Sequence, residues 1–156
     1  MIQVKDGSRT LQFNGKLLGK SSSWRGGSTR WIEFELYKTE SGSYVLSRIG
    51  VSVTFHTGAC HLVRRYGLQE ISTTELKQDA VPCLECQPSF DVAVVFPEKD
   101  RYWAQVSEDP TAVLDALYKH DAAGARYLTH VAQRLLETAA AIDTGIESIY
   151  KIEMIP

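Results

Sequence analysis

The chain contains few cysteines, and their number is odd. Three cysteines in 156 residues are too few for the disulfide scaffold of a small secreted domain. No run of eighteen apolar residues occurs, so we expect no helix that spans a membrane. No apolar stretch follows a basic amino terminus, so we expect no signal peptide. These absences together predict a protein of a reducing cytoplasm without a membrane partner.

The sequence also lacks the common catalytic and nucleotide-binding motifs. It has no G-x-S-x-G, no H-E-x-x-H and no glycine-rich dinucleotide turn. The Ser- and Gly-rich stretch 21–28 lacks the lysine of a phosphate-binding loop, and it lies between two predicted strands. The absence of a complete catalytic set favours a binding or accessory protein over an enzyme.

A few residue pairs keep a nuclease or another hydrolase open as an alternative. Arg126 and His130 resemble the helical Arg…His pair of HEPN ribonucleases, although they stand closer together than in that motif. Glu33 and Glu35 occupy one face of a predicted strand, and paired carboxylates can act as general acid and base when they share a cleft. Solvated strand faces have the same pattern, so neither pair predicts an activity by itself.

Composition and length are those of an ordinary globular domain. Hydrophobic residues make up 44% of the chain and charged residues 23%. A chain of 156 residues is long enough to form a hydrophobic core. We therefore predict a single domain over residues 1–156, with no internal repeat and no linker that would separate two domains.

The net charge of −2 conceals an uneven distribution along the chain. Residues 1–68 carry ten Lys or Arg and four Asp or Glu, whereas the remaining residues carry seven and fifteen. A basic first half suggests an anionic partner, but attraction between the two halves or simple solvation explains the pattern as well.

Residues 1–55 are predicted to form an antiparallel meander of three or four strands. Apolar and aromatic residues alternate with glutamates over residues 31–37, as in a half-buried strand. Residues 40–43 (ESGS) have the composition of a hairpin turn, and a Val- and Ile-rich strand follows over 44–55.

Three segments of this meander resemble the opening of bacterial EXLDI-type small proteins. They are FNGKLLG at 13–19, YKT at 37–39 and GSYVL at 42–46. The resemblance lies within residues 11–46, about a quarter of the chain. It implies a bacterial protein of unknown function, and it transfers no active site.

Residues 56–88 concentrate the chemically reactive side chains of the chain. Cys83 and Cys86 form a C-x2-C pair, which places two thiolates on one tight turn. His56 and Cys60, with Gly58 between them, form a second half-site. A Cys3His set closes the tetrahedral shell of a structural zinc ion, so we predict a zinc-knuckle-like insertion.

Three alternatives remain open for this segment. His61 flanks Cys60 as closely as His56 does and is an alternative ligand. The thiols could instead be plain buried core residues. A redox pair is the third reading, but Pro88 disfavours the helix that follows a thioredoxin-like C-x2-C.

The remaining residues, 89–156, are predicted to contain strands followed by helices. Strands are expected over 90–96 and 102–106, and Asp109-Pro110 has the form of a helix start that leads to Tyr118. A longer amphipathic helix is expected from about residue 122 to 142, ended by Gly145. A last strand is expected over 149–155.

The predicted fold class is therefore α+β, an antiparallel sheet with two carboxy-terminal helices packed on it. The predicted function is that of a small zinc-stabilised adaptor or accessory protein with a protein partner. A nucleic-acid-binding module is the alternative, because Trp24, Arg25 and Arg30 combine an aromatic ring with basic groups in the basic half.

Overall fold

The computed structural model describes residues 1–86 and 92–156 of the chain. The fold is α+β, as predicted, with mostly antiparallel strands in the first half and most helices in the second. The described residues form two compact units. Unit 1 comprises Met1–Ser23, Ile32–Ile49 and Tyr102–Pro156, and unit 2 comprises Trp24–Trp31 and Gly50–Arg101.

A four-stranded sheet provides the framework of unit 1. Its strands are β3 (Gly15–Ser22), β4 (Arg30–Thr39), β5 (Tyr44–Ser52) and β10 (Arg101–Ser107), in the order β10-β5-β4-β3. The period-two pattern of β4 buries Phe34 and Leu36 on one face. Gly42, with φ of 92°, supplies the positive φ that the turn before β5 requires. Strands β1 (Ile2–Asp6) and β2 (Arg9–Phe13) form a separate antiparallel hairpin in the same unit.

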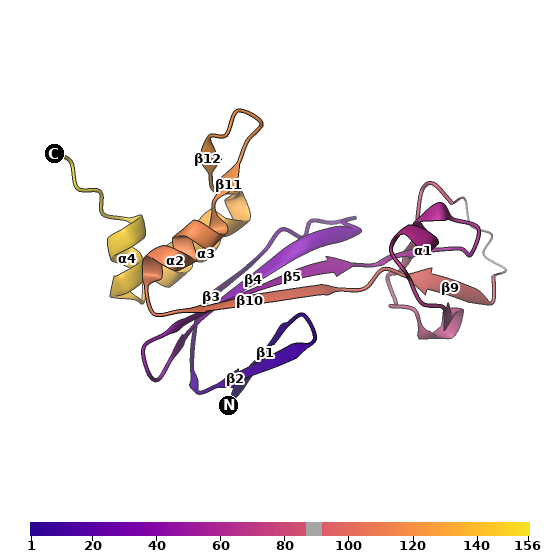
Figure 1. Cartoon of the computed structure of the whole chain (residues 1–156), viewed down its shortest axis with the longest axis horizontal. Coiled ribbons are helices and arrows are strands. Elements are labelled where there is room, and N and C mark those ends of the chain that lie inside the picture. Colours follow the sequence, from indigo (N-terminus) through magenta and orange to yellow (C-terminus); the bar gives the residue numbers. More distant parts are fainter. Residues whose placement is uncertain (87–91) are drawn as a thin grey trace. The chain divides into compact units, whose positions relative to one another are not determined.

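Three helices cover one side of this sheet (Figure 1). They are α2 (Pro110–Leu117), α3 (His130–Ala140) and α4 (Thr144–Tyr150). Leu135 and Leu136 of α3 are fully buried in the core with Leu18 and Leu36 of the sheet. At Gly19 a side chain would meet α3 within 3.4 Å, so the missing side chain lets α3 approach β3 closely.

The helices differ in number and extent from those predicted. Helix α2 begins at Pro110 after the Asp109 cap, as expected. The expected helix 122–142 is wrong in its first part: α3 begins only at His130, and a short hairpin of β11 (Lys119–His120) and β12 (Arg126–Tyr127) precedes it. Gly124 causes this difference, because its φ of 84° forms a turn where a helix would need negative φ.

The predicted last strand over 149–155 is also wrong. Residues Thr144–Tyr150 form α4, and Gly145 lies in its first turn instead of ending the preceding helix. The carboxylate of Asp143 caps α4 by accepting a hydrogen bond from the amide of Ile146 at 3.0 Å. This cap starts a third carboxy-terminal helix after α2 and α3, whereas two carboxy-terminal helices were predicted.

Asp143 also joins α4 to the sheet. Its carboxylate accepts hydrogen bonds from Lys38 and Tyr44, each at 2.7 Å. Burial alone would raise the pKa of Asp143, but the hydrogen bonds from Lys38, Tyr44 and the Ile146 amide outweigh it and hold the pKa below its ordinary value. The charged carboxylate is therefore the form that stabilises unit 1.

Unit 2 is built from short elements. They are β6 (Thr54–His56), α1 (His61–Arg65), β7 (Ile71–Ser72), the 3-10 turn η1 (Thr73–Glu75), β8 (Val81–Pro82) and β9 (Val94–Pro97). The sheet order is β7-β9-β6-β8, with β8 parallel to β6 and β9 antiparallel to it. Residues 90 and 91 of the predicted strand 90–96 lie outside the described residues, and β9 begins at Val94.

No helix in residues 1–86 and 92–156 has the length and apolar character that a membrane span requires.

Candidate metal centre

The first half-site lies at the end of strand β6. His56 is the last residue of β6, and its side chain is fully buried. The chain then turns through Gly58, and the Cys60 amide closes the turn on the carbonyl of Thr57 at 3.0 Å. Cys60 stands at the start of α1, and its side chain makes no capping hydrogen bond to the helix. The Sγ atom of Cys60 lies 3.5 Å from Nδ1 of His56.

The second half-site follows strand β8. The Cys83 amide donates to the carbonyl of Phe55 at 2.8 Å, which fixes Cys83 beside β6. The chain turns back over Leu84 and Glu85, and the Glu85 amide donates to the Cys83 sulfur at 3.4 Å. Such amide donors favour the thiolate form of a sulfur that binds a metal. Leu84 itself is 96% exposed at the tip of this turn.

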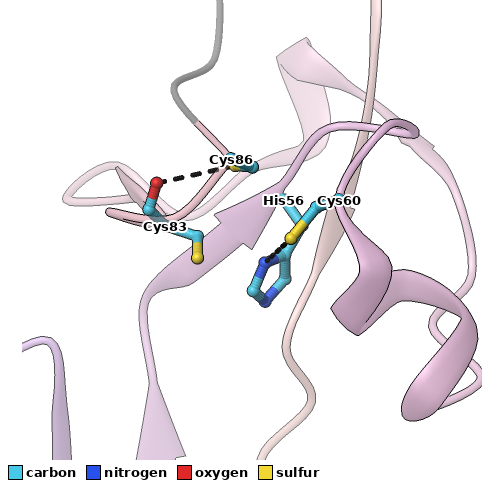
Figure 2. A group of neighbouring side chains, drawn as sticks. All are labelled: His56, Cys60, Cys83 and Cys86. Carbon is cyan, nitrogen blue, oxygen red and sulfur yellow. Dashed lines mark hydrogen bonds between the residues drawn. The ribbon is translucent and has the colours of Figure 1, made fainter.

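The two half-sites meet in one cluster, as Figure 2 shows. One ligand atom from each of His56, Cys60, Cys83 and Cys86 lies within 4.8 Å of all the others. Sulfur atoms bound to one tetrahedral zinc ion are about 3.8 Å apart, which follows from a Zn–S distance of about 2.3 Å. The cluster therefore needs only a small contraction to enclose an ion. The three cysteines are free thiols in the structure.

The structure distinguishes between the two candidate histidines. His61 is 69% exposed and lies 3.6 Å from the carboxylate of Glu85, outside the cluster. The geometric reason is that His61 follows the turn and occupies the outer side of α1, whereas His56 precedes the turn inside the sheet. His56 is therefore the histidine that the fold places beside the cysteines.

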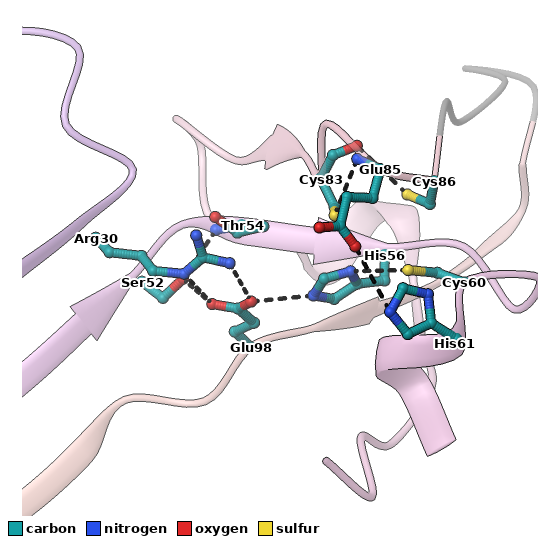
Figure 3. A network of polar contacts seen from close by, with 10 residues as sticks. All are labelled: Arg30, Ser52, Thr54, His56, Cys60, His61, Cys83, Glu85, Cys86 and Glu98. Carbon is teal, nitrogen blue, oxygen red and sulfur yellow. Dashed lines mark hydrogen bonds and ion pairs between the residues drawn. The ribbon is translucent and has the colours of Figure 1, made fainter. Parts of the chain in front are cut away.

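A carboxylate that the sequence analysis did not identify lies behind His56. Oε1 of Glu98 is 3.0 Å from Nε2 of His56, on the opposite side of the ring from Cys60 (Figure 3). Glu98 also accepts from Ser52 Oγ at 2.7 Å, and from Arg30 through Nε at 2.9 Å and Nη2 at 2.5 Å. Burial alone would raise the pKa of Glu98, but the donors Arg30, Ser52 and His56 lower it to about 2.

Electrostatics in the cluster disfavour three uncompensated thiolates. Burial raises the pKa of Cys60, and proximity to Cys83 and Cys86 raises it further. Burial and the neighbouring sulfurs both disfavour the negatively charged thiolate. A divalent cation at the centre of the cluster would compensate this charge and so favour the thiolate form. The donor set is also chemically selective, since thiolate and imidazole suit Zn²⁺ far better than Mg²⁺ or Ca²⁺.

The residues considered for nucleic-acid binding lie in the loop before β4 and at the first position of that strand. Trp24 and Arg25 are exposed in the loop before β4, where Arg25 and Ser28 close a turn. Arg30 is bound to Glu98 by a bidentate ion pair and is thereby part of the metal-centre network.

The residues considered for a hydrolase lie in the following elements and make the following contacts. Arg126 lies in β12 and pairs with Asp115, whereas His130 opens α3, so the two do not share a helix. The carboxylate of Glu35 accepts a hydrogen bond from Tyr37.

Comparison with known proteins gives no family for this chain: no protein-family model, curated protein or solved structure matches it. The coordination chemistry of unit 2 is therefore the main guide to function.

Proposed function

We propose that unit 2 holds one structural zinc ion and that the chain is a zinc-stabilised protein-binding or accessory protein. The observation that carries this proposal is the buried cluster of His56, Cys60, Cys83 and Cys86, whose ligand atoms lie within 4.8 Å of one another. Free thiols at this spacing suit a reducing compartment such as the cytoplasm.

The composition of the cluster supports a structural rather than a catalytic ion. A catalytic zinc typically has three protein ligands and leaves a fourth position for water or substrate. Here four protein side chains each offer one ligand atom, which is the number that a tetrahedral shell requires. His56 and Cys83 are buried, so neither substrate nor solvent would reach the ion from their side. The ion would then contribute folding energy to unit 2.

The outer surface of the Cys83–Cys86 turn supports a protein partner. Leu84 is 96% exposed because the two cysteines on either side of it turn inward. The ion would hold the backbone of this turn in one conformation, which lowers the entropy lost when a partner binds it. The ion pair between Arg30 and Glu98 weakens the nucleic-acid alternative, since it occupies one of its three residues.

Metal analysis tests the ion directly. Full-length protein purified without a polyhistidine tag is expected to contain about one zinc ion per chain. Cys83→Ala should lose the ion, whereas His61→Ala should keep it, because His61 lies outside the cluster. A wild-type protein that folds fully without metal would refute the proposed ion.

A pair of leucine variants tests the partner surface. Proximity labelling in the native host, followed by reconstitution with the purified candidate, should give a complex that Leu84→Asp abolishes. Leu17→Asp, a matched change at an exposed leucine of unit 1, should leave the complex intact. Salt-dependent binding of single-stranded DNA or RNA that Arg25→Ala removes would favour the nucleic-acid alternative instead.

A further inference from the structure

The polar contacts of His56 place a different partner at each of its two ring nitrogens. The two ring nitrogens of His56 face different partners: Nδ1 lies 3.5 Å from the Cys60 sulfur, and Nε2 lies 3.0 Å from Glu98. A histidine that binds a metal through one nitrogen commonly donates its other N–H to a carboxylate, which fixes the tautomer and the ring orientation. Glu98 is in the position of that carboxylate.

Glu98 is itself held in place from three sides. Its backbone amide donates to the carbonyl of Thr54 at 3.0 Å, which sets the residue against β6. Ser52 and Arg30 donate to its carboxylate, and Arg30 does so through two nitrogen atoms. A bidentate guanidinium–carboxylate pair fixes the plane of the carboxylate as well as its distance. Glu98 therefore presents Oε1 to His56 in one orientation, as Figure 3 shows.

Arg30 comes from a part of the chain that is distant in sequence. It is separated from Glu98 by 68 positions and belongs to the stretch Trp24–Trp31 of unit 2, which comprises the loop after β3 and the first two residues of β4. The side chain of Arg30 is 54% exposed, so burial of apolar surface does not account for the position of its guanidinium group. The ion pair with Glu98 does. The contact with Glu98 gives this stretch a chemical connection to the metal centre.

We propose that Glu98 is the positioning residue of the metal centre and that Arg30 acts on the ion through Glu98. This inference rests on the proposed zinc site and extends it from four ligands to an ordered relay of Arg30, Glu98 and His56. The relay makes His56 bind the ion through Nδ1 with the proton on Nε2. It also makes ion affinity depend on a residue that does not touch the ion.

The first test compares two carboxylates in the same stretch. Glu98→Gln is expected to weaken zinc binding by roughly 10- to 100-fold, as is typical for such partners of metal-bound histidine. Asp100→Asn is the matched control, because Asp100 accepts from Ser52 and Lys77 but does not contact His56. It should change affinity less than about threefold. Competition with a chelator of known affinity measures both on the full chain.

The second test asks whether Arg30 acts through Glu98. Arg30→Gln alone is expected to weaken zinc binding several-fold, whereas the same change in the Glu98→Gln background should have almost no further effect. Nitrogen-15 NMR of the His56 ring should show metal-bound Nδ1 and protonated Nε2 in the wild type, with exchange of the Nε2 proton faster in Glu98→Gln. A purely structural contribution would not alter this ring signal selectively.

The outcomes separate this inference from the proposed function. Wild-type protein that binds zinc, with Glu98→Gln binding it equally well, overturns the relay and leaves the zinc site standing. Equal losses in Glu98→Gln and Asp100→Asn also overturn it. Wild-type protein that binds no zinc overturns both. If Glu98→Gln does not fold, Arg30→Gln becomes the deciding variant, because it keeps the Glu98 carboxylate. Weakened zinc binding in Arg30→Gln then supports the relay, and unchanged zinc binding refutes it.

Discussion

Unit 1 and unit 2 are stabilised by different kinds of interior. Unit 1 has a hydrophobic core in which α3 packs against the sheet through Leu135, Leu136 and their neighbours. Among the described residues of unit 2, the buried apolar side chains other than cysteine are Val53, Phe55 and Val95. Its remaining interior consists of His56, two of the cysteines and several hydroxyl groups. Small domains with so small a core are often reinforced by a structural metal, disulfides or oligomerisation.

Removal of the proposed zinc ion should give the largest difference between the units. A strong zinc chelator is expected to unfold unit 2 and to leave unit 1 folded, because ion binding at such sites contributes on the order of 10 kcal/mol. Hydrogen exchange with mass spectrometry on the full chain measures this: amide protection should vanish over residues 53–83 and persist in α3. Simultaneous loss of protection in α3 would show that the two units are not independently stabilised.

The second largest effect is expected in the core of unit 1. Leu135→Ala should lower the free energy of unfolding of unit 1 by about 2–5 kcal/mol, because Leu135 is fully buried and its removal leaves a cavity. Denaturant unfolding followed by the exchange protection of α3 checks the value. Zinc content should stay at the wild-type level; a loss of zinc would contradict the separation of the two interiors.

A smaller, pH-dependent effect is expected at Asp143. Asp143→Asn keeps a helix cap on α4 but loses the charge that Lys38 pairs with, which should cost about 2 kcal/mol at neutral pH. The folded protein lowers the pKa of Asp143, so this stabilisation is complete above the ordinary carboxyl pKa near 4 and disappears as the pH falls through the lower folded value.

Unfolding curves of wild type and Asp143→Asn from pH 7 down to pH 2 should therefore converge at the acid end. The control is Asp115→Asn, which removes an exposed ion pair with Arg126 and should change stability by less than about 0.5 kcal/mol. A gap for Asp143→Asn that does not narrow with acid would refute the assigned charge state.

The smallest effect on stability is expected at the exposed leucine of unit 2. Leu84→Ala should change the unfolding free energy by no more than about 0.5 kcal/mol and should leave zinc content unchanged, because the side chain is 96% exposed. Thermal unfolding and metal analysis of the same sample test this. A loss of zinc in Leu84→Ala would mean that the turn between the cysteines depends on this side chain.

Local signals in the sequence predicted those parts of the fold that local physics determines. The Asp109-Pro110 start of α2 and the strand pattern of β4 are examples, since caps and period-two burial act over a few residues. The helix expected over 122–142 failed because one glycine, Gly124, reverses the chain. The strand expected over 149–155 failed because alternation without a neighbouring strand has nothing to pair with, and the Asp143 cap favours a helix.

The candidate metal centre was likewise predictable only in those features that depend on local spacing. Spacing indicated the four ligands, and the structure brings them together. The choice between His56 and His61 depended on which side of the turn is buried, which spacing does not show. Glu98 carried no signal, because a carboxylate that contacts a ligand from 42 positions away belongs to no local motif. Its contact exists only once β9 pairs with β6.

The order of the two units along the chain has a consequence for synthesis on the ribosome. The four candidate ligands, Arg30 and Glu98 all precede Tyr102, at which the last stretch of unit 1 begins. Unit 2 is therefore complete in the emerging chain while unit 1 still lacks most of β10 and the helices α2, α3 and α4. Domains generally fold as they emerge, amino-terminal parts first. Zinc supply at that moment, rather than in the finished protein, would decide whether the nascent chain presents a closed unit or three unprotected thiols.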